Sequence, residues 1–561
     1  MFSNYEAMLA AERDVWPDPA GERVRWARRY QDSPTRFLAA FGRAAEIRDN
    51  QAVIAASAVL RDNDALNESQ ALSLVRALIA HGRFDEAIKV AGPLCDGGAR
   101  LPKASYEMAR ALAGAGRFDE AAAAAAAAAA MRPDVGSAGG LGDVLERTLR
   151  LERSRDEPSF SWPDVRALLE LYQGLDARAC ATRFVRELIE TRPGPPPENT
   201  EDALAVARIG LDFLPSDVAG RLLDSLASGG IDAGVFAPLR ILCEAQFCEA
   251  NNDPIGAVQC LGSLSGRYAI EMDTRNAIAR NVGRMVLGGA SVRFVAGGRR
   301  KVFNLLPFND ELAMLRIRLD EMADWVDHFV IVEARETFTG RPKPLHFDQA
   351  KAAFAAHADK ITHVVVDAFP DGIATPWARD FYQRDKAIEG LSGCCAEDDL
   401  VLITDADEIV RRSAVEDFDG QIARLTMSRY CFFLNYRPSS GPGLKRRDGP
   451  TGAIVRARHL AHHGASYLRF WFSRYRNDWC ALPNAGWHFM SAKTPAAIAD
   501  KYRSYAHQEH DPGKVDEAYL ADRLAAIRSG KAKKGWERCE IDQSYPECIR
   551  RRPEELADLI L

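Results

Sequence analysis

The sequence has few of the features that mark membrane, secreted or nucleic-acid-binding proteins. No window approaches the ~18 uninterrupted apolar residues of a membrane-spanning helix. The first residues, MFSNYEAMLAAERDVWPDPAGERVRW, show no basic flank followed by an apolar stretch. The 11 cysteines lack CxxC spacing, and their odd number does not suggest a disulfide framework. A formal net charge of −6 offers no basic footprint for nucleic acid. We therefore expect a cytoplasmic protein without a nucleic-acid partner or a membrane-spanning segment.

The length of the chain predicts more than one domain. At 561 residues it exceeds the size at which a single hydrophobic core stops growing, about 250–300 residues. A hydrophobic fraction of 47% with a charged fraction of 27% is typical of globular proteins.

A short internal repeat organises the first half of the chain. The hexapeptide GRFDEA occurs at 82–87 and again at 116–121, a shift of about 34 residues, which is the period of a tetratricopeptide helix pair. In the second copy, small residues and a terminal proline fall where that repeat places them: Ala109, Gly116, Ala121, Ala128 and Pro133. The segment therefore resembles a tetratricopeptide repeat.

Weaker helical patterns extend this array in both directions. Because each repeat buries its apolar face only against its neighbours, we expect several irregular units across 35–285, with a Pro/Gly-rich linker at 191–200. We thus predict a helical-repeat domain over 1–290, followed by a glycine-rich linker at 291–300. Such arrays commonly supply a concave surface for a protein or glycan partner, although a plain helical spacer is the alternative.

After the linker, apolar strand-like runs alternate with a helical pattern. KVFNLLPF (301–308), HFVIVEA (328–334), KITHVVVDAF (360–369) and DLVLITDA (399–406) read as strands, and 311–326 has helical spacing. Crossovers of this length imply a mostly parallel sheet. The predicted fold class is therefore an all-α repeat solenoid followed by an α/β domain over 301–561.

Two aspartates directly follow the last of these strands. Asp405 and Asp407 emerge at the carboxyl end of the strand, where ligands of such sheets bind, and residues two apart in an extended chain point to the same side. Together they can bind one hard cation, which typically completes its shell with substrate phosphates. Either aspartate can instead be the N-cap of the segment after Ile409. The spacing alone is weak, because Asp62-Asn63-Asp64 shows it too.

A longer series of motifs resembles glycosyltransferase family 17, the β-1,4-mannosyl-glycoprotein N-acetylglucosaminyltransferase family. The resemblance begins at KVFNLLPFNDELAMLRIRLDEMADWVDHFVIVEARETFTGRPKPLHF (301–347), continues through TDADEI (404–409) and AGWHF (485–489), and closes with DQSYPECIRRRPEELADLI. It implies a GT-A fold and an inverting, metal-dependent sugar transfer from a UDP-sugar, N-acetylglucosamine in characterised members, with Mn²⁺ or Mg²⁺. Asp405 and Asp407 then match the metal and diphosphate motif, and Glu408 supports them.

The same resemblance suggests further site residues, each with a structural alternative. Donor binding is assigned to residues on the strand ends, the TFTG loop, a following helix and the last motifs: Glu333, Thr337, Thr339, Gly340, Lys343, Arg379, Arg384, Trp487 and Lys501. The alternatives are a surface turn for the TFTG loop, a solvated helix face for the arginines and simple packing for Trp487. His488 is the candidate third metal ligand, with His507 as its competitor.

The sequence leaves the general base and the acceptor open. An inverting transfer needs a base that removes the acceptor hydroxyl proton, and Asp478, Glu509 and Asp511 are all chemically suitable. YLRFWFSRYRNDW (467–479) suits either an acceptor platform or a packed strand, and 438–452 reads as a mobile loop. The family's Asn-Glu pair after the first strand appears here as Asp310-Glu311, which departs from the pattern.

Three functional hypotheses follow. The leading one is a metal-dependent glycosyltransferase whose helical repeats recruit a protein or glycan acceptor, or another partner. The second is a non-catalytic repeat scaffold with a degenerate nucleotide-sugar-binding domain, which would not bind UDP. The third is a metal-dependent nucleotidyltransferase, which would release pyrophosphate rather than UDP.

Overall fold

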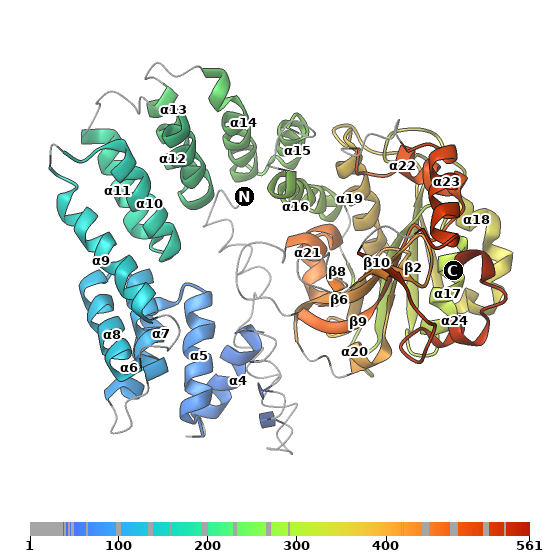
Figure 1. The fold of residues 1–561 in the computed structure, drawn as a ribbon, viewed down its shortest axis with the longest axis horizontal. Coiled ribbons are helices and arrows are strands. Elements are labelled where there is room, and N and C mark those ends of the chain that lie inside the picture. Colours follow the sequence, from blue (N-terminus) through green and yellow to red (C-terminus); the bar gives the residue numbers. More distant parts are fainter. Residues whose placement is uncertain are drawn as a thin grey trace. The chain divides into compact units, whose positions relative to one another are not determined.

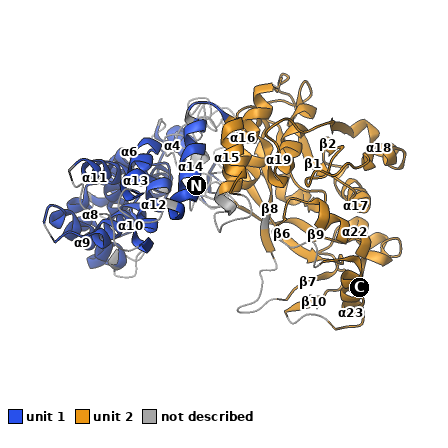
Figure 2. Cartoon of the chain, turned by 90° about the horizontal axis from the view of Figure 1, so that it is seen from above, with its two compact units in different colours: residues 1–253, 476–478 blue, residues 254–475, 479–561 orange. Residues whose placement is uncertain are grey.

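The chain forms two compact units, each described here by itself. The computed structural model describes residues 37–38, 41–42, 45, 50–62, 65–96, 102–132, 138–157, 159–191, 200–227, 233–264, 271–289, 292–416, 418, 420–439, 448–471, 481–508, 515–531 and 535–561. One unit contains the described residues up to Asp253, and the other contains those from Pro254 onward (Figure 2).

The first unit consists of consecutive helices, as the repeat predicted (Figure 1). Successive helices pack on one another from α4 to α11 and from α12 to α14, and second neighbours pack as well: α5 on α7, α10 on α12, α11 on α13 and α12 on α14. The helices are α4 (Asn50–Asp62), α5 (Glu68–Ala80), α6 (Phe84–Asp96), α7 (Pro102–Gly114), α8 (Phe118–Met131), α9 (Ala138–Ser154), α10 (Trp162–Gly174), α11 (Arg178–Thr191), α12 (Thr200–Phe213), α13 (Ser216–Ala227) and α14 (Ala233–Ala250).

The two GRFDEA copies fold in the same way. Gly82 and Gly116 have φ of 66° and 76°, a left-handed conformation that suits glycine at a helix end. The arginine that follows each glycine pairs with the glutamate three residues later, Arg83 with Glu86 and Arg117 with Glu120. The alanine that closes each copy is fully buried. Pro133, the predicted repeat-ending proline, lies outside the described residues, as does most of the linker at 191–200.

The second unit begins with two helices that precede the predicted linker. α15 (Pro254–Gly262) packs on α16 (Glu271–Gly289), and α16 packs on α19 (Pro376–Lys386) and α21 (Ala465–Trp471). Gly283 of α16 allows this approach, because a Cβ there would lie 2.8 Å from the backbone nitrogen of Gly464. The compact unit therefore starts at Pro254, whereas the change in composition marks 291–300.

An eight-stranded sheet forms the core of this unit, in the order β3-β2-β1-β4-β8-β6-β9-β5. A separate pair joins β10 to β7. The strands are β1 (Val302–Phe308), β2 (His328–Ala334), β3 (Ile361–Val366), β4 (Leu400–Ile403), β5 (Glu408–Val410), β6 (Ile422–Cys431), β7 (Tyr436–Pro438), β8 (Asp448–Arg456), β9 (Ala481–Met490) and β10 (Trp536–Arg538).

The sheet is mixed, so the prediction of a mostly parallel sheet holds for only half of it. β3, β2, β1 and β4 are parallel neighbours, as the strand–helix–strand pattern indicated. Beyond β4, the pairs β4–β8, β6–β8 and β5–β9 are antiparallel, and only β6–β9 is parallel. The prediction rests on the strand–helix–strand pattern of 301–406, which covers only the parallel half of the sheet.

Helices cover the sheet and complete the unit (Figure 1). Besides α15, α16, α19 and α21 they are α17 (Leu312–Met322), α18 (His346–Ala350), α20 (Arg412–Glu416), α22 (Pro495–Ser504), α23 (Glu517–Arg528) and α24 (Glu547–Arg551), with 3₁₀ helices at Lys351–Lys360, Ala387–Leu391, Ala457–Ala461 and Ala557–Leu559. Among the described residues, no helix combines the length and the apolar character needed to cross a bilayer.

Candidate functional site

Asp405 and Asp407 lie in the tight turn that joins β4 to β5. β4 is buried along its whole length, and the turn closes with a hydrogen bond from the Glu408 N–H to the Asp405 carbonyl, 3.0 Å. The segment after Ile409 continues as β5, and the next helix, α20, begins only at Arg412. The alternative that either aspartate caps a helix there is therefore wrong. Both carboxylates belong to the carboxyl edge of β4, where the sequence placed them.

Two arginines hold the carboxylate of Asp405. Arg384 of α19 donates to Oδ1 at 2.5 Å, and Arg469 of α21 donates to Oδ2 at 2.8 Å. Arg384 also bonds the buried Asp380, 2.9 Å away, one helical turn earlier. Burial alone would raise the pKa of Asp405, but the charges of Arg384 and Arg469 hold it well below its ordinary value. Asp405 is therefore ionised at neutral pH.

Glu408 and Arg318 fix the shape of the turn. The Glu408 carboxylate accepts from Arg469 at 2.7 and 2.8 Å and from the N–H of Asp405 at 2.9 Å. Arg318, fully buried on α17, donates to the carbonyls of Asp405 and Glu408 and to the Thr404 hydroxyl. Such charge-assisted bonds are the strong ones in proteins. The predicted supporting role of Glu408 thus has a geometric basis, although it acts through Arg469.

Asp407 faces a different set of cations. The pairing of β5 with β9 sets Glu408 opposite His488, and His488 Nε2 lies 3.4 Å from Asp407 Oδ1. Lys501 of α22 places Nζ 3.2 Å from Oδ2. Burial opposes ionisation of Asp407, yet Lys501 and His488 hold its pKa below the ordinary value. Burial lowers the pKa of His488, but the Asp407 charge outweighs this and raises it.

A divalent cation fits the Asp407 side of the site. Ligand atoms of one such ion lie about 2.0–2.2 Å from it, so two neighbouring ligands are about 3 Å apart, close to the Asp407–His488 separation. Asp405 already bonds an arginine through each oxygen, but an ionised carboxylate has about four acceptor positions, so some remain. Among the described residues, no group of three or more His, Cys, Asp and Glu side chains is arranged as a metal cluster. Asp407 and His488 are the residues that best suit the ion.

The TFTG loop is held by its own side chains. Glu333 is buried at the end of β2, accepts from the Phe347 N–H at 3.2 Å and lies 3.4 Å from Lys343 Nζ. The Thr339 hydroxyl donates to the Arg503 carbonyl at 3.0 Å, and Arg503 lies on α22 two residues after the lysine that reaches Asp407. Thr337 accepts from the Arg341 N–H at 3.0 Å. The loop is thus anchored to the helix that carries Lys501.

The remaining predicted residues are spread more widely. Gly340 has φ of 84°, and a Cβ there would meet the Arg379 guanidinium. Arg379 donates to the Phe338 carbonyl at 3.3 Å, so it supports the TFTG loop while Arg384 reaches the aspartate. Trp487 is buried, and its indole N–H donates to the Ser544 carbonyl at 2.9 Å, an arrangement that suits packing. His507 lies against the Trp377 ring, with centroids 4.6 Å apart.

Several residues of the site were not predicted. Arg469 lies in YLRFWFSRYRNDW (467–479), for which the sequence leaves an acceptor platform or a packed strand open; its described part, 467–471, belongs instead to helix α21. Arg318 and Lys493, which pairs with Glu311 at 3.0 Å, were also missed. Arg318 did carry a signal, because it interrupts the apolar face formed by Leu315 and Met322. The candidate bases Asp478, Glu509 and Asp511, and most of the loop at 438–452, lie outside the described residues.

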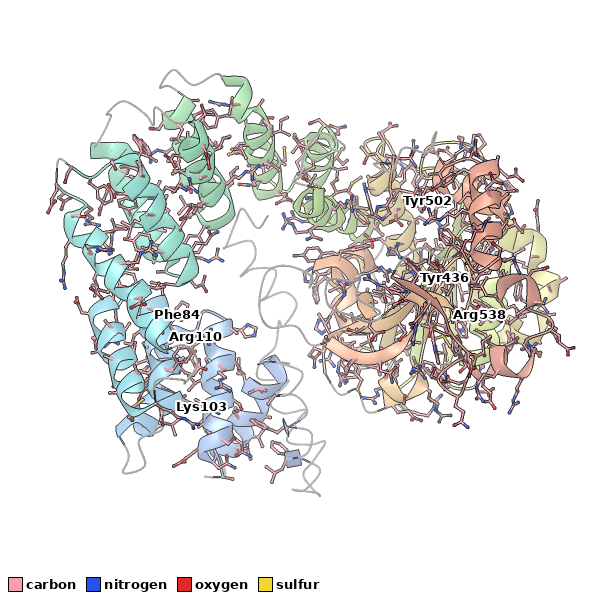
Figure 3. The ribbon with its side chains drawn as sticks, viewed as in Figure 1. Phe84, Lys103, Arg110, Tyr436, Tyr502 and Arg538 are labelled. Carbon is pink, nitrogen blue, oxygen red and sulfur yellow. The ribbon has the colours of Figure 1, made fainter. Side chains whose placement is uncertain are left out.

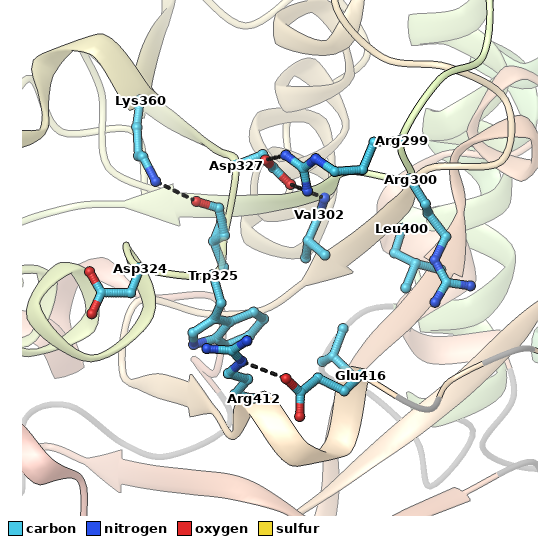
Figure 4. A pocket seen from close by; sticks show the side chains of 12 residues that line it. Arg299, Arg300, Val302, Asp324, Trp325, Asp327, Lys360, Leu400, Arg412 and Glu416 are labelled. Carbon is cyan, nitrogen blue, oxygen red and sulfur yellow. Dashed lines mark hydrogen bonds and ion pairs between the residues drawn. The ribbon is translucent and has the colours of Figure 1, made fainter.

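A cavity of about 290 Å³ lies at the amino ends of the strands, away from Asp405 and Asp407 (Figure 4). Val302 and Leu400, at the amino ends of β1 and β4, line it, whereas the aspartates follow the carboxyl end of β4. Its charged residues pair among themselves, Arg412 with Glu416 at 2.6 Å and Arg299 with Asp327. The candidate site and this cavity are therefore separate.

The part of the chain that carries Asp405 and Asp407 is similar to glycosyltransferases: residues 289–438 match the model of glycosyltransferase family 17. The "Beta-1,4-mannosyl-glycoprotein 4-beta-N-acetylglucosaminyltransferase" of Rattus norvegicus and that of Homo sapiens are each 35% identical over 124 residues. The match covers 21% of this chain and 23% of each relative, so it spans about a quarter of their length.

Among the solved structures that match part of the chain is one of a protein complex. It is titled "Structure of Naa15/Naa10 bound to HypK-THB", with 18% sequence identity, a TM-score of 0.18, and coverage of 45% of this chain and 39% of that one. A likeness this low carries no argument about fold or function.

Proposed function

We propose that the second unit is a GT-A-type glycosyltransferase that transfers a sugar from a UDP-sugar to a hydroxyl of a glycan or protein acceptor. N-acetylglucosamine or a related hexose is the transferred sugar, with inversion at the reacting carbon and Mn²⁺ or Mg²⁺ as the cation. The observation that carries this proposal is the Asp405–Glu408 turn. Two ionised aspartates stand at a strand end, each within reach of cationic side chains, in a domain similar to family 17.

The chain's own residues supply binding and positioning. Arg469 and Arg318 lock the turn, so both aspartates keep one geometry while the donor enters. Lys501 stands beside Asp407 and adds positive charge where the departing diphosphate develops negative charge. A cation held by Asp407 and His488 would neutralise the same diphosphate. Asp478, Glu509 and Asp511 remain the candidates for the base.

The helical unit has a supporting role in this proposal. Its consecutive helices resemble repeat arrays, whose stacked units commonly bind proteins or other extended ligands. We assign to it the recruitment of the acceptor or of a partner that carries it.

Donor turnover tests the proposal. UDP release from UDP-N-acetylglucosamine is measured with Mn²⁺ for the full chain and for Asp405→Asn and Asp407→Asn. Removing one such electrostatic group is expected to lower turnover by about 10²-fold or more. Asp367→Asn is the matched control, because that aspartate is exposed and pairs only with the exposed Arg335 in a surface ion pair.

The outcomes separate the hypotheses. Loss of UDP release in both site variants, with Asp367→Asn unchanged, supports the assignment. Undiminished turnover in both site variants contradicts it. Release of pyrophosphate in place of UDP would assign nucleotidyl transfer instead.

A further inference from the structure

A cavity of about 390 Å³ lies in the second unit between α23, β7 and β10. None of the charged residues around Asp405 and Asp407 lines it. Its size falls within the range of small-molecule sites, about 300–1,000 Å³. Its lining combines aromatic side chains with a few charged ones.

Four aromatic side chains contribute to the lining: Phe432, Tyr436, Tyr519 and Trp536. Tyr436, labelled in Figure 3, and Trp536 stack with ring centroids 5.2 Å apart and planes 24° apart. They come from the paired strands β7 and β10, so the backbone ladder sets their positions. Tyr519, from α23, is 47% exposed, whereas Phe432 and Tyr436 are buried. Among these rings, Tyr519 therefore gives the cavity an aromatic face that solvent can reach.

Charged groups surround these faces. Asp522, Arg523 and Lys531 line the same cavity. The Asp522 carboxylate can accept hydrogen bonds there, and the Arg523 guanidinium and the Lys531 ammonium can donate them. Arg523 donates to the Tyr519 hydroxyl at 3.0 Å, and its guanidinium lies 5.0 Å from the centre of the Phe432 ring. A ligand for this cavity must combine an apolar face with several hydroxyl or amide groups along its edge.

Phe432 adopts a backbone conformation that large side chains rarely take. Its φ is 68°, and a bulky residue in that region is a genuine outlier. The N–H of Phe432 donates to the Met490 carbonyl at 2.9 Å, which fixes the residue at the end of the β6–β9 pair. Such outliers persist where the surroundings hold them in place, and they gather at ligand sites. The strain turns the Phe432 ring into the cavity lining.

One helix connects the cavity to the site. α22 carries Lys501, which reaches Asp407, and next to it Tyr502, which packs against the cluster that includes Phe432 and Tyr436. α22 also packs on α23. In the β6–β9 pair, Arg429 stands opposite His488, three residues before Phe432. The cavity and the aspartates are therefore supported by the same elements.

We propose that this cavity binds a pyranose unit of the acceptor, an inference that rests on the proposed sugar transfer. One face of a pyranose consists of C–H groups that stack on aromatic rings, and its edge carries hydroxyls that bond charged side chains. A purely apolar ligand would leave Asp522, Arg523 and Lys531 without bonds to it. The mixture of rings and both signs of charge thus favours a saccharide.

The test measures saccharide binding to the full chain without donor. N,N′-diacetylchitobiose and mannobiose are the saccharide probes, n-octanol is the apolar probe, and saturation-transfer NMR reports contact. Tyr519→Ala and Asp522→Ala should each weaken saccharide binding about tenfold, because stacking or a hydrogen bond is lost. Ile255→Ala is the control, since Ile255 is an exposed apolar residue of the same unit, 45% accessible, that does not line the cavity.

The outcomes distinguish this proposal from the transferase proposal. Binding of either saccharide that weakens in Tyr519→Ala but persists in Asp407→Asn supports the cavity, whatever the donor turnover. Saccharide binding that is equal in Tyr519→Ala and the unmodified chain overturns it. So does binding of n-octanol without binding of either saccharide.

Discussion

The helical unit and the sheet unit bury different kinds of side chain. In the described residues up to Asp253, the buried polar or charged side chains are few: Ser57, Ser105, Glu107, Thr148 and Gln246. The single buried charge among them, Glu107, pairs with two half-exposed arginines, Arg76 and Arg110, each at 2.8 Å. The sheet unit instead buries Arg318, Glu333, Asp380, Arg384, Asp385, Asp399, Asp407, Glu408, Arg424, Arg456, Arg458 and Arg469.

This difference shows that the sheet unit, and not the helical unit, tolerates the free-energy cost of burying many charged side chains. Burying a charge costs free energy unless it is paired and hydrogen-bonded, and packed apolar residues stabilise a core as well or better. The helical unit follows the cheaper solution. Three of the buried arginines of the sheet unit, Arg318, Arg384 and Arg469, converge on one turn, Thr404–Glu408.

Removing Arg469 should have the largest effect on stability. Arg469→Met leaves Glu408 buried without its guanidinium and removes one of the two arginines at Asp405. Breaking a buried pair in this way typically costs about 3–5 kcal/mol. Urea unfolding of the full chain measures this loss as a decrease in the free energy of unfolding of the sheet unit. A loss below about 1 kcal/mol would show that the cluster is not a tightly coupled buried network.

Asp385 should make the sheet unit sensitive to pH. Burial raises its pKa to about 7, and its Oδ2 has no hydrogen-bond partner in the structure. The pKa of Asp385 is higher in the folded state than in the unfolded state. Its contribution to the free energy of unfolding is therefore fully present below about pH 4 and is lost as the pH rises through about 7. The change amounts to about 4 kcal/mol at most, since one pKa unit corresponds to about 1.4 kcal/mol.

Asp385→Asn provides the comparison for this prediction. The amide keeps an acceptor for the Ser466 N–H, which bonds Asp385 Oδ1 at 2.7 Å, but it does not titrate. The free energy of unfolding of the variant should vary less than that of the unmodified chain between pH 4 and pH 8. Identical pH profiles would contradict a raised pKa of Asp385.

In the helical unit, the sharpest effects should come from packing. A Cβ at Gly114 would lie 2.3 Å from the Phe84 ring, labelled in Figure 3, whereas nothing lies within 4 Å of a Cβ at Gly142. Gly114→Ala should therefore destabilise by about 1–3 kcal/mol, and Gly142→Ala should stabilise by about 0.5–1 kcal/mol. Thermal unfolding measures both. A shift of the same sign in both variants would refute the packing argument.

The smallest effect is expected for a surface pair of the repeat. Arg83 and Glu86 are 2.7 Å apart but both partly exposed, and the hydrogen bond from Arg83 lowers the pKa of Glu86. Glu86→Gln should cost only about 0.3 kcal/mol in urea unfolding, less in high salt, because exposed pairs are screened. A cost above about 1 kcal/mol would mean that this pair behaves like the buried ones of the sheet unit.

What the sequence could predict follows from how far apart the interacting residues are. The ion pair of GRFDEA joins residues three apart, so the same short sequence forms it in both copies of the repeat. The position of Asp405 and Asp407 followed from the buried strand just before them. Arg469 bonds Glu408 and Asp405 from 61 and 64 residues away, so no local pattern could identify it. The antiparallel half of the sheet was missed because its strands β6, β8 and β9 lie beyond the strand–helix–strand pattern of 301–406 on which the prediction rests.

The central claim is that the Asp405–Glu408 turn is the binding site for the donor diphosphate. Its most direct test is a titration of the full chain with UDP in the presence of Mn²⁺. Calorimetry should show UDP binding that weakens about 100-fold or more in Asp407→Asn, a loss of roughly 2.7 kcal/mol. Asp367→Asn should bind UDP as the unmodified chain does. Equal UDP affinity in Asp407→Asn and the unmodified chain would contradict the claim.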